Sequence, residues 1–285
     1  MISSCSHRLR LAERLTWYIC PVCSAKVFVE IKETLPGGRA ITLWGVATGT
    51  LNGAEGWEAR AHEHLEDTRD GGWAGLVREW GGKEVERWPH GLWQGKKLGS
   101  VQRGGVGKAS DEERVEGWCK CRSVRFRVTR KAGERFPARL CMCDACRGTS
   151  GTEVAGWAEV PSGCLQLGWE GEGSGVSEVG KWQALKNYVA TPGEVRYSCK
   201  TCGAPAFIVS DAEAEKIRAA AGLLDAPEGA RAEGWLAWQM NSIDGEKEAM
   251  RRHPTLVEAL RHELGRASGE NPTHGVVQQP MKTSG

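Results

Sequence analysis

The sequence has almost no net charge and no long apolar segment. Its 285 residues contain 38 Lys and Arg against 36 Asp and Glu, so no basic excess marks a nucleic-acid-binding or polybasic membrane-binding surface. No run approaches the roughly 18 apolar residues of a transmembrane helix. The first residues also lack the apolar core of a secretion signal. These absences predict a cytoplasmic protein with no membrane segment and no nucleic-acid partner.

Histidine is missing from residues 116–250, because all seven histidines lie outside that range. A metal site there must be built from thiolates, with Asp, Glu or water as the local alternatives. Cysteine, by contrast, is abundant. Nine of the eleven cysteines occur in C-x-C and C-x-x-C clusters, a pattern that indicates metal binding rather than disulfides in a reducing compartment. Cys5 and Cys164 stand alone, and Cys164 is predicted to be a small buried apolar residue.

The seven clustered cysteines between residues 116 and 250 divide into four plus three. Two pairs can close a tetrahedral structural zinc site, whereas a triplet leaves one position open, as catalytic zinc sites do. The triplet Cys141, Cys143 and Cys146 is therefore predicted to bind a zinc ion with an open position. The two pairs straddle this segment and are predicted to join its first strand to its last through a structural zinc. These four ligands are Cys119, Cys121, Cys199 and Cys202.

The chain also repeats itself. YICPVCSAKVFVE, from Tyr18, aligns with YSCKTCGAPAFIV, from Tyr197, at an offset of 179 residues. Further on, ATGTLNGAEG aligns with AAGLLDAPEG at an offset of 173. Two matches in the same order predict a duplicated domain. The first copy has few residues ahead of its Tyr, so it is predicted to be the back half of a domain whose front half is missing.

Strand patterns predominate. Val124, Phe126 and Val128 alternate with polar residues, and Gly and Pro recur through 151–205 as turns between short strands require. The repeat predicts a strand at 217–223 despite strong helix propensity there. An apolar face in LVEALRHEL (256–264) predicts a helix. The predicted fold class is mainly β, with a short C-terminal helix.

The predicted domain organisation has five parts. A Gly-rich, charged segment is typical of a linker, and the polar C-terminal end is typical of a disordered tail. The parts are a truncated, degenerate copy (1–98), a linker (99–115), an intact domain (116–250), the C-terminal helix (251–265) and the tail (266–285).

All seven cysteines lie in three stretches, which are, in order, WCKCRSVRF, RLCMCDACRGTSG and RYSCKTCGA. A GLLD segment follows the last of them. This pattern resembles the glutathione-dependent formaldehyde-activating enzyme family, which includes the centromere protein V type, over about 118–250, with a weaker echo over 17–95. The resemblance implies a small β fold with two Zn²⁺ ions, the four-cysteine set matching the structural ligands and the triplet the second, open zinc. It also implies a carbon–sulfur lyase-type reaction that joins glutathione to formaldehyde as S-(hydroxymethyl)glutathione. Arg122 stands where the family commonly has glycine, and Met142 where it often has histidine.

Three thiolates make Zn²⁺ a weak Lewis acid that can hold an incoming thiol as thiolate. We therefore expect Cys141, Cys143 and Cys146 to form a catalytic centre at which a thiol such as glutathione adds to a small aldehyde. Arg147 and Glu153 could orient a carboxylate or relay a proton, although a solvent-exposed structural role is favoured for both. The alternative function is a non-catalytic, zinc-stabilised binding module.

In the first copy, Cys20 and Cys23 have no C-x-C partner at the expected distance. Cys5 and His7 could complete a weak metal site with them, in the pattern C-x-H-x₁₂-C-x₂-C. Two free thiols on a truncated domain are the favoured alternative, and this copy is not expected to be catalytic.

Overall fold

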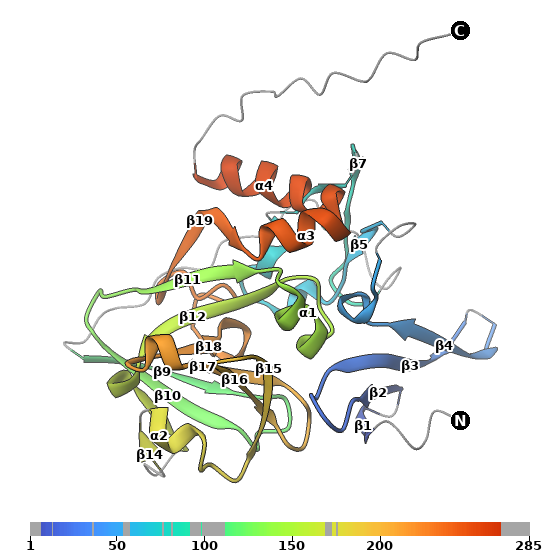
Figure 1. Cartoon of the computed structure of the whole chain (residues 1–285). Coiled ribbons are helices and arrows are strands. Elements are labelled where there is room, and N and C mark those ends of the chain that lie inside the picture. The colour runs from blue at the N-terminus through green and yellow to red at the C-terminus, as the bar shows by residue number, and fades with distance from the viewer. Residues whose placement is uncertain are drawn as a thin grey trace, which may run out of the picture.

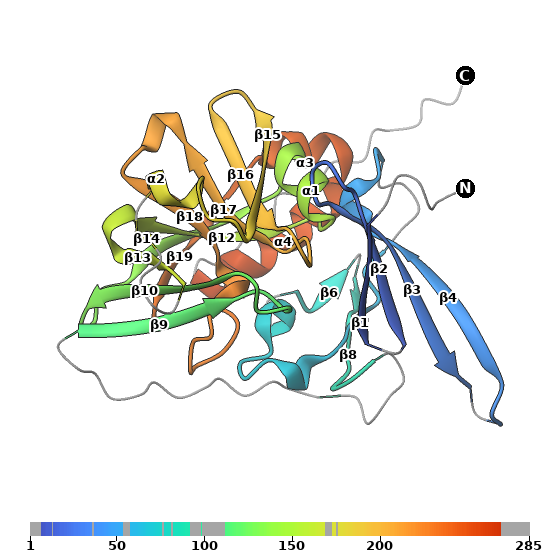
Figure 2. The same ribbon diagram turned by 90° about the horizontal axis from the view of Figure 1, so that it is seen from below.

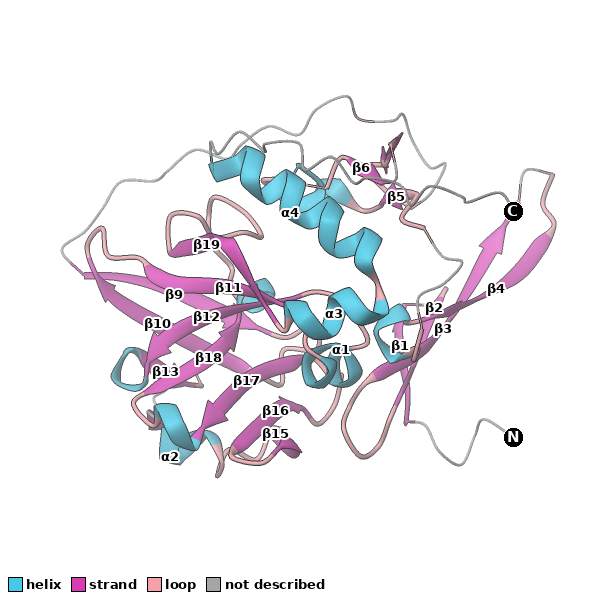
Figure 3. Ribbon diagram, turned by 45° about the horizontal axis from the view of Figure 1, so that its top comes forward, coloured by secondary structure: helices cyan, strands magenta, loops and turns pink. Residues whose placement is uncertain are grey.

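The structure is a computed structural model in which strands outnumber helices (Figure 3), so the prediction of a mainly β fold is confirmed. It describes residues 7–12, 14–35, 37–53, 58–75, 77–80, 82–91, 98, 112–168, 173–174 and 176–268. The C-terminal end of the predicted linker, residues 112–115, is strand, while 99–111 lie outside the described residues.

The largest sheet has seven strands, in the order β15-β16-β17-β18-β12-β11-β19. Neighbouring strands are antiparallel except for β11 and β19, which run parallel. The strand predicted at 217–223 is present as far as Ala220, after which a 3₁₀ turn, η6 (Ala221–Leu223), begins. The seven strands are β11 (Phe136–Cys141), β12 (Ala155–Pro161), β15 (Leu185–Thr191), β16 (Glu194–Cys199), β17 (Pro205–Ser210), β18 (Lys216–Ala220) and β19 (Leu236–Asp244).

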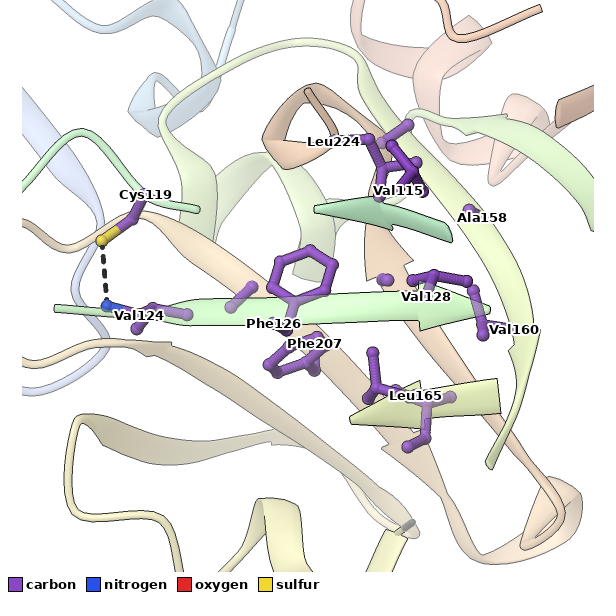
Figure 4. Close-up of a cluster of buried hydrophobic side chains, with 14 of the residues drawn as sticks. Val115, Cys119, Val124, Phe126, Val128, Ala158, Val160, Leu165, Phe207 and Leu224 are labelled. Carbon is purple, nitrogen blue, oxygen red and sulfur yellow. Dashed lines mark hydrogen bonds between the residues drawn. The ribbon is translucent and has the colours of Figure 1, made fainter. Parts of the chain in front are cut away.

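A second sheet, in the order β14-β13-β10-β9, packs against the first. Its strands are β9 (Glu112–Trp118), β10 (Arg125–Lys131), β13 (Leu165–Leu167) and β14 (Gly173–Ser174). The alternation seen in the sequence buries Phe126 and Val128 on one face. Phe126 meets Phe207 edge-on with 5.1 Å between ring centroids (Figure 4), and each such ring contributes roughly 1.5–3 kcal/mol through burial. This core holds the two sheets together.

The N-terminal residues form a separate four-stranded sheet, in the order β1-β2-β3-β4, which lies beside the main body (Figures 1 and 2). Its strands are β1 (His7–Ala12), β2 (Leu15–Ile19), β3 (Lys26–Thr34) and β4 (Ala40–Val46), followed by the 3₁₀ turn η1 (Thr48–Thr50). Short elements follow, namely β5 (Ala61–His62), η2 (Leu65–Asp67), η3 (Gly72–Gly75), β6 (Glu79–Trp80), β7 (Lys83–Glu84) and β8 (Glu86–Arg87).

The strand pairing of the N-terminal sheet matches that of β15–β18 in register. His7 pairs with Ile19 as Lys186 pairs with Ser198, each position shifted by the offset of 179 residues. Both hairpins carry a register shift at the equivalent point, between Arg10 and Ala12 and between Val189 and Thr191. The turns η1 and η6 also coincide at the offset of 173.

The helices are α1 (Asp144–Ser150), α2 (Val176–Val179), α3 (Glu246–Arg252) and α4 (Pro254–Ser268), with 3₁₀ turns at η4 (Ser162–Cys164) and η5 (Asp211–Glu213). The predicted C-terminal helix is confirmed by α4, whose Leu256, Leu260 and Leu264 are buried in one cluster with Val85 and Trp80. The helix extends to Ser268, three residues into the predicted tail. Among the described residues, no helix has the length and apolarity needed to cross a membrane.

Candidate metal centre

Four cysteine sulfurs converge where β9 and β16 end. Cys119 directly follows β9 and Cys199 is the last residue of β16, while Cys121 and Cys202 lie in the turns that follow. All four sulfurs lie within 4.8 Å of one another, and Cys121 Sγ is 3.4 Å from Cys119 Sγ and 3.5 Å from Cys199 Sγ. Thiolates about 2.3 Å from one tetrahedral zinc ion lie about 3.8 Å apart, so this donor set fits Zn²⁺.

Backbone donors and neighbouring thiols surround these sulfurs. The Val124 amide donates to Cys119 Sγ at 3.3 Å (Figure 4), and the Cys202 amide donates to Cys199 Sγ at 3.4 Å. Hydrogen bonds from the thiols of Cys199 and Cys202 hold the pKa of Cys119 far below its usual value. The arrangement therefore favours the thiolate form of Cys119, while the hydrogen bonds to Cys119 raise the pKa of Cys199 and Cys202.

Arg122, in the turn between Cys121 and β10, adopts a left-handed backbone with φ 62°. This conformation costs a non-glycine residue about 1–2 kcal/mol. Its guanidinium lies 4.0 Å from the centre of the Trp118 ring, a cation–π contact that offsets part of the cost. The turn that joins Cys119 and Cys121 to β10 therefore forms with arginine in place of glycine.

The other three sulfurs gather at the start of α1 and also lie within 4.8 Å of one another. Cys141 ends β11, and Cys143 caps α1 by accepting a 3.3 Å hydrogen bond from the Cys146 amide. Cys141 and Cys146 are buried, whereas Cys143 is half-buried. Hydrogen bonds from the thiols of Cys141 and Cys146 hold the pKa of Cys143 far below its usual value. Three thiolates in this arrangement also fit Zn²⁺.

Arg196, which the sequence analysis did not single out, lies next to this triplet. Its Nη1 donates to Cys146 Sγ at 3.3 Å, and its Nη2 donates to Glu194 Oε2 at 3.3 Å. The side chain comes from β16 and is buried. Arg196 and Cys146 are 50 residues apart in the sequence and only the fold brings them together, so no local sequence pattern predicts their contact.

Arg147 and Glu153 have structural partners. Arg147 Nε donates to Asp144 Oδ1 at 2.8 Å, and its Nη1 donates to the carbonyl oxygens of Gly49 (2.8 Å) and Leu51 (2.7 Å). The buried Glu153 accepts from Arg252 at 3.3 Å. The contacts of both side chains agree with a structural role. The expected solvent exposure is wrong, because Glu153 is 8% exposed and the Arg147 side chain is 11% exposed.

The end of β19 and the helix α3 form hydrogen bonds with Met142 and the start of α1. The Met142 side chain is fully buried in the cluster beneath α4, and its amide donates to the Asp244 carbonyl at 2.8 Å. Glu248 Oε2 accepts from the Asp144 amide at 2.7 Å. Met142 is thus a packing residue that holds Cys141 and Cys143 in place.

An open cleft of about 690 Å³ reaches the triplet at Cys143. Distant parts of the chain line this cleft. Cys23 comes from the turn between β2 and β3 of the N-terminal sheet. Cys143 and Thr149 come from the start of α1 and from α1 itself, and Tyr188 and Glu194 come from the β15–β16 hairpin. The cleft gives a small molecule access to Cys143, the least buried of the three ligands.

Cys20 and Cys23 form a turn like that of Cys199 and Cys202. Within the described residues no third ligand joins this pair. Cys5 lies outside the described residues, as does the His7 side chain, so the weak site formed by these four residues stays a prediction.

Comparison with known proteins identifies the segment that carries both sulfur clusters. No curated protein matches the chain. A solved structure of a Rhodobacter sphaeroides protein is 22% identical, covering 44% of this chain and 99% of that chain with a TM-score of 0.29. Residues 114–238 match the model of the family described as glutathione-dependent formaldehyde-activating enzyme.

Proposed function

We propose that residues 112–244 form a zinc-dependent carbon–sulfur lyase-like enzyme that adds a small thiol to a small aldehyde. The observation that carries this proposal is the cluster of three sulfurs, of which Cys143 faces an open cleft. The family match over 114–238 supports glutathione as the first thiol to test and formaldehyde as the first aldehyde. The product would be S-(hydroxymethyl)glutathione or an analogue.

The two sulfur clusters have different roles in this proposal. Cys119, Cys121, Cys199 and Cys202 would hold a structural Zn²⁺, because four ligands leave no place for substrate. Cys141, Cys143 and Cys146 would hold a second Zn²⁺, whose open position binds the thiol as thiolate, the nucleophile needed to attack a carbonyl carbon. Arg196 stabilises the negative charge of Cys146 through its 3.3 Å contact.

We also infer that residues 7–51 are a copy of the unit formed by 186–224. The shared registers, the shared register shift and the coincident turns η1 and η6 support a duplication. Residues 7–51 contain only two cysteines, Cys20 and Cys23, so these residues would not form a catalytic centre by themselves. Instead, they line the cleft through Cys23.

The function is tested on the full chain by metal analysis and by an assay for the thiol–aldehyde adduct. We expect two zinc ions per chain, one of them readily removed by a chelator, and adduct formation from glutathione and formaldehyde. Cys143→Ser should lose the labile zinc and the activity, whereas Cys164→Ser, a matched change of a half-buried cysteine outside both clusters, should keep both.

A non-catalytic binding module is the competing function. It predicts a single inert zinc ion per chain and no acceleration of adduct formation over the uncatalysed reaction. The same outcome would refute the enzyme proposal, so one set of measurements separates the two functions.

A further inference from the structure

Two buried N–H groups next to the triplet lack hydrogen-bond acceptors. Within the part of the chain that the structure describes, neither Arg196 Nε nor Trp157 Nε1 has a partner. The Arg196 side chain is 8% exposed and Trp157 is 6% exposed. An unsatisfied buried donor costs about 1–3 kcal/mol, so two of them in one place point to a missing acceptor.

Both residues line one small cavity, together with Cys23 and Thr149. About 20 Å³ of it is open to the centre of a water-sized molecule, enough for one water or a one-carbon carbonyl group. The cavity therefore has room for a small group that accepts hydrogen bonds, but not for a larger one.

The cavity adjoins the candidate metal centre and the cleft. Trp157 packs in one cluster with Cys141 and Cys146, and Arg196 donates to Cys146 Sγ. Cys23 and Thr149 line both this cavity and the larger cleft that contains Cys143. The cavity and the cleft therefore adjoin each other at Cys23 and Thr149.

We propose that Arg196 and Trp157 form an oxyanion pocket that binds the carbonyl oxygen of the aldehyde substrate. This inference rests on the proposed function. The thiolate sulfur forms a bond to the carbonyl carbon, and the π electron pair of the C=O bond moves onto the oxygen. The oxygen becomes an alkoxide that accepts hydrogen bonds from Arg196 Nε and Trp157 Nε1. It then takes up one proton from solvent, which replaces the proton lost by the thiol.

The charges favour this role. Arg196 is paired with one carboxylate, Glu194, and lies at the sulfur of Cys146, so its guanidinium is held in a fixed direction. Fixed donors in a site of low dielectric stabilise a developing oxyanion without reorganising. The indole N–H adds a second donor without adding charge. The small volume selects formaldehyde and other short aldehydes over bulky carbonyl compounds.

The first experiment measures binding rather than activity and uses formate, a small oxyanion, as the probe. The indole N–H resonance of Trp157 is assigned in the ¹⁵N NMR spectrum by its loss in Trp157→Phe. We expect formate to shift this resonance in the zinc-loaded full chain, and to bind at least 10-fold more weakly to Arg196→Lys, which lacks Nε–H. An unmoved Trp157 resonance at saturating formate would overturn the pocket.

The second experiment measures turnover. Trp157→Phe removes the donor but keeps an aromatic ring, and we expect kcat to fall about 100-fold, with zinc content and the KM of the thiol unchanged. The matched control is Trp238→Phe, whose indole donates instead to the Arg231 carbonyl at 2.7 Å and which should keep normal turnover. If Trp157→Phe does not fold, Arg196→Lys takes its place.

The results separate the two proposals. Normal kcat in both Trp157→Phe and Arg196→Lys, in an active wild-type enzyme, would overturn the pocket and leave the proposed function intact. Formate binding at Trp157 without any adduct formation would refute the proposed function and support the pocket as an anion site.

Discussion

Residues 7–51 and 186–224, two units with matching strand registers, have the same backbone pattern but different surroundings. The C-x-x-C turns make equivalent hydrogen bonds: the Cys20 amide donates to Ala25 at 2.8 Å, and the Cys199 amide donates to Ala204 at 2.9 Å. Ser24 and Gly203, at equivalent positions, both have a left-handed backbone, with φ of 66° and 67°. Local sequence is enough to set this framework.

The burial of equivalent side chains differs sharply. Phe207 is fully buried against Phe126, whereas its counterpart Phe28 is only half-buried. Trp44 is 54% exposed, although its counterpart, Ile217, is 0% exposed. The second unit packs against the β14-β13-β10-β9 sheet and supplies half of a four-cysteine cluster. The first unit accepts hydrogen bonds from Arg147 of α1 and from Lys186 of β15. The comparison shows that strand pairing and a C-x-x-C turn do not by themselves make a core or a metal site.

The largest difference is expected for the equivalent cysteines. Cys199→Ser should lose one zinc ion and about 4 kcal/mol or more of unfolding free energy, because the other three thiolates stay buried without metal. Cys20→Ser should cost less than about 1 kcal/mol, since no third ligand among the described residues joins the pair. Thermal unfolding and zinc content check both variants. Equal losses in the two variants would mean that the first unit also binds metal.

The equivalent phenylalanines should differ next. Phe207→Ala removes a fully buried ring and should cost about 3–5 kcal/mol. Phe28→Ala should cost less, roughly 1–2 kcal/mol, because Phe28 is only partly buried. Thermal unfolding of the zinc-loaded chain measures both. A larger loss for Phe28 would contradict the view that the first unit lacks a core of its own.

The contact between the first unit and α1 should be weaker than either core. Arg147→Ala removes two hydrogen bonds to the carbonyls of Gly49 and Leu51, and we expect amide exchange at Gly49 to become about 10-fold faster. Arg125→Ala, which loses a bond only to the neighbouring Arg122 carbonyl, is the matched control. Unchanged exchange in Arg147→Ala would show that other contacts hold the unit in place.

Opposite effects are expected where a glycine and a serine share one backbone conformation. Ser24→Gly should stabilise the chain by about 0.5–1 kcal/mol, because glycine adopts a positive φ without steric cost. Gly203→Ala should destabilise it by about 1–2 kcal/mol, since the added Cβ would also lie 3.0 Å from Ile19 Cγ2. Thermal unfolding tests the signs, and the same sign for both changes would contradict this explanation.

The sequence predicted the parts of the molecule that depend on local spacing. Alternation in VRFRV predicted β10, the apolar face of LVEALRHEL predicted α4, and the repeat correctly favoured a strand over a helix at Ile217. The four-plus-three grouping of the cysteines corresponds to the two sulfur clusters in the structure. The bounds of α4 and the start of β9 were less accurate, because helix and strand ends depend on tertiary contacts.

By itself, the sequence determined which cysteines belong together, because thiolate spacing of C-x-C and C-x-x-C is a local property that the backbone turns preserve. Only the tertiary structure decided what surrounds them. Arg196 reaches Cys146 across 50 residues, Trp157 reaches the same cavity from β12, and Cys23 lines the cleft from the other unit. These approaches depend on sheet order and on the docking of one unit against the other, and long-range packing of this kind leaves no periodic signal along the chain.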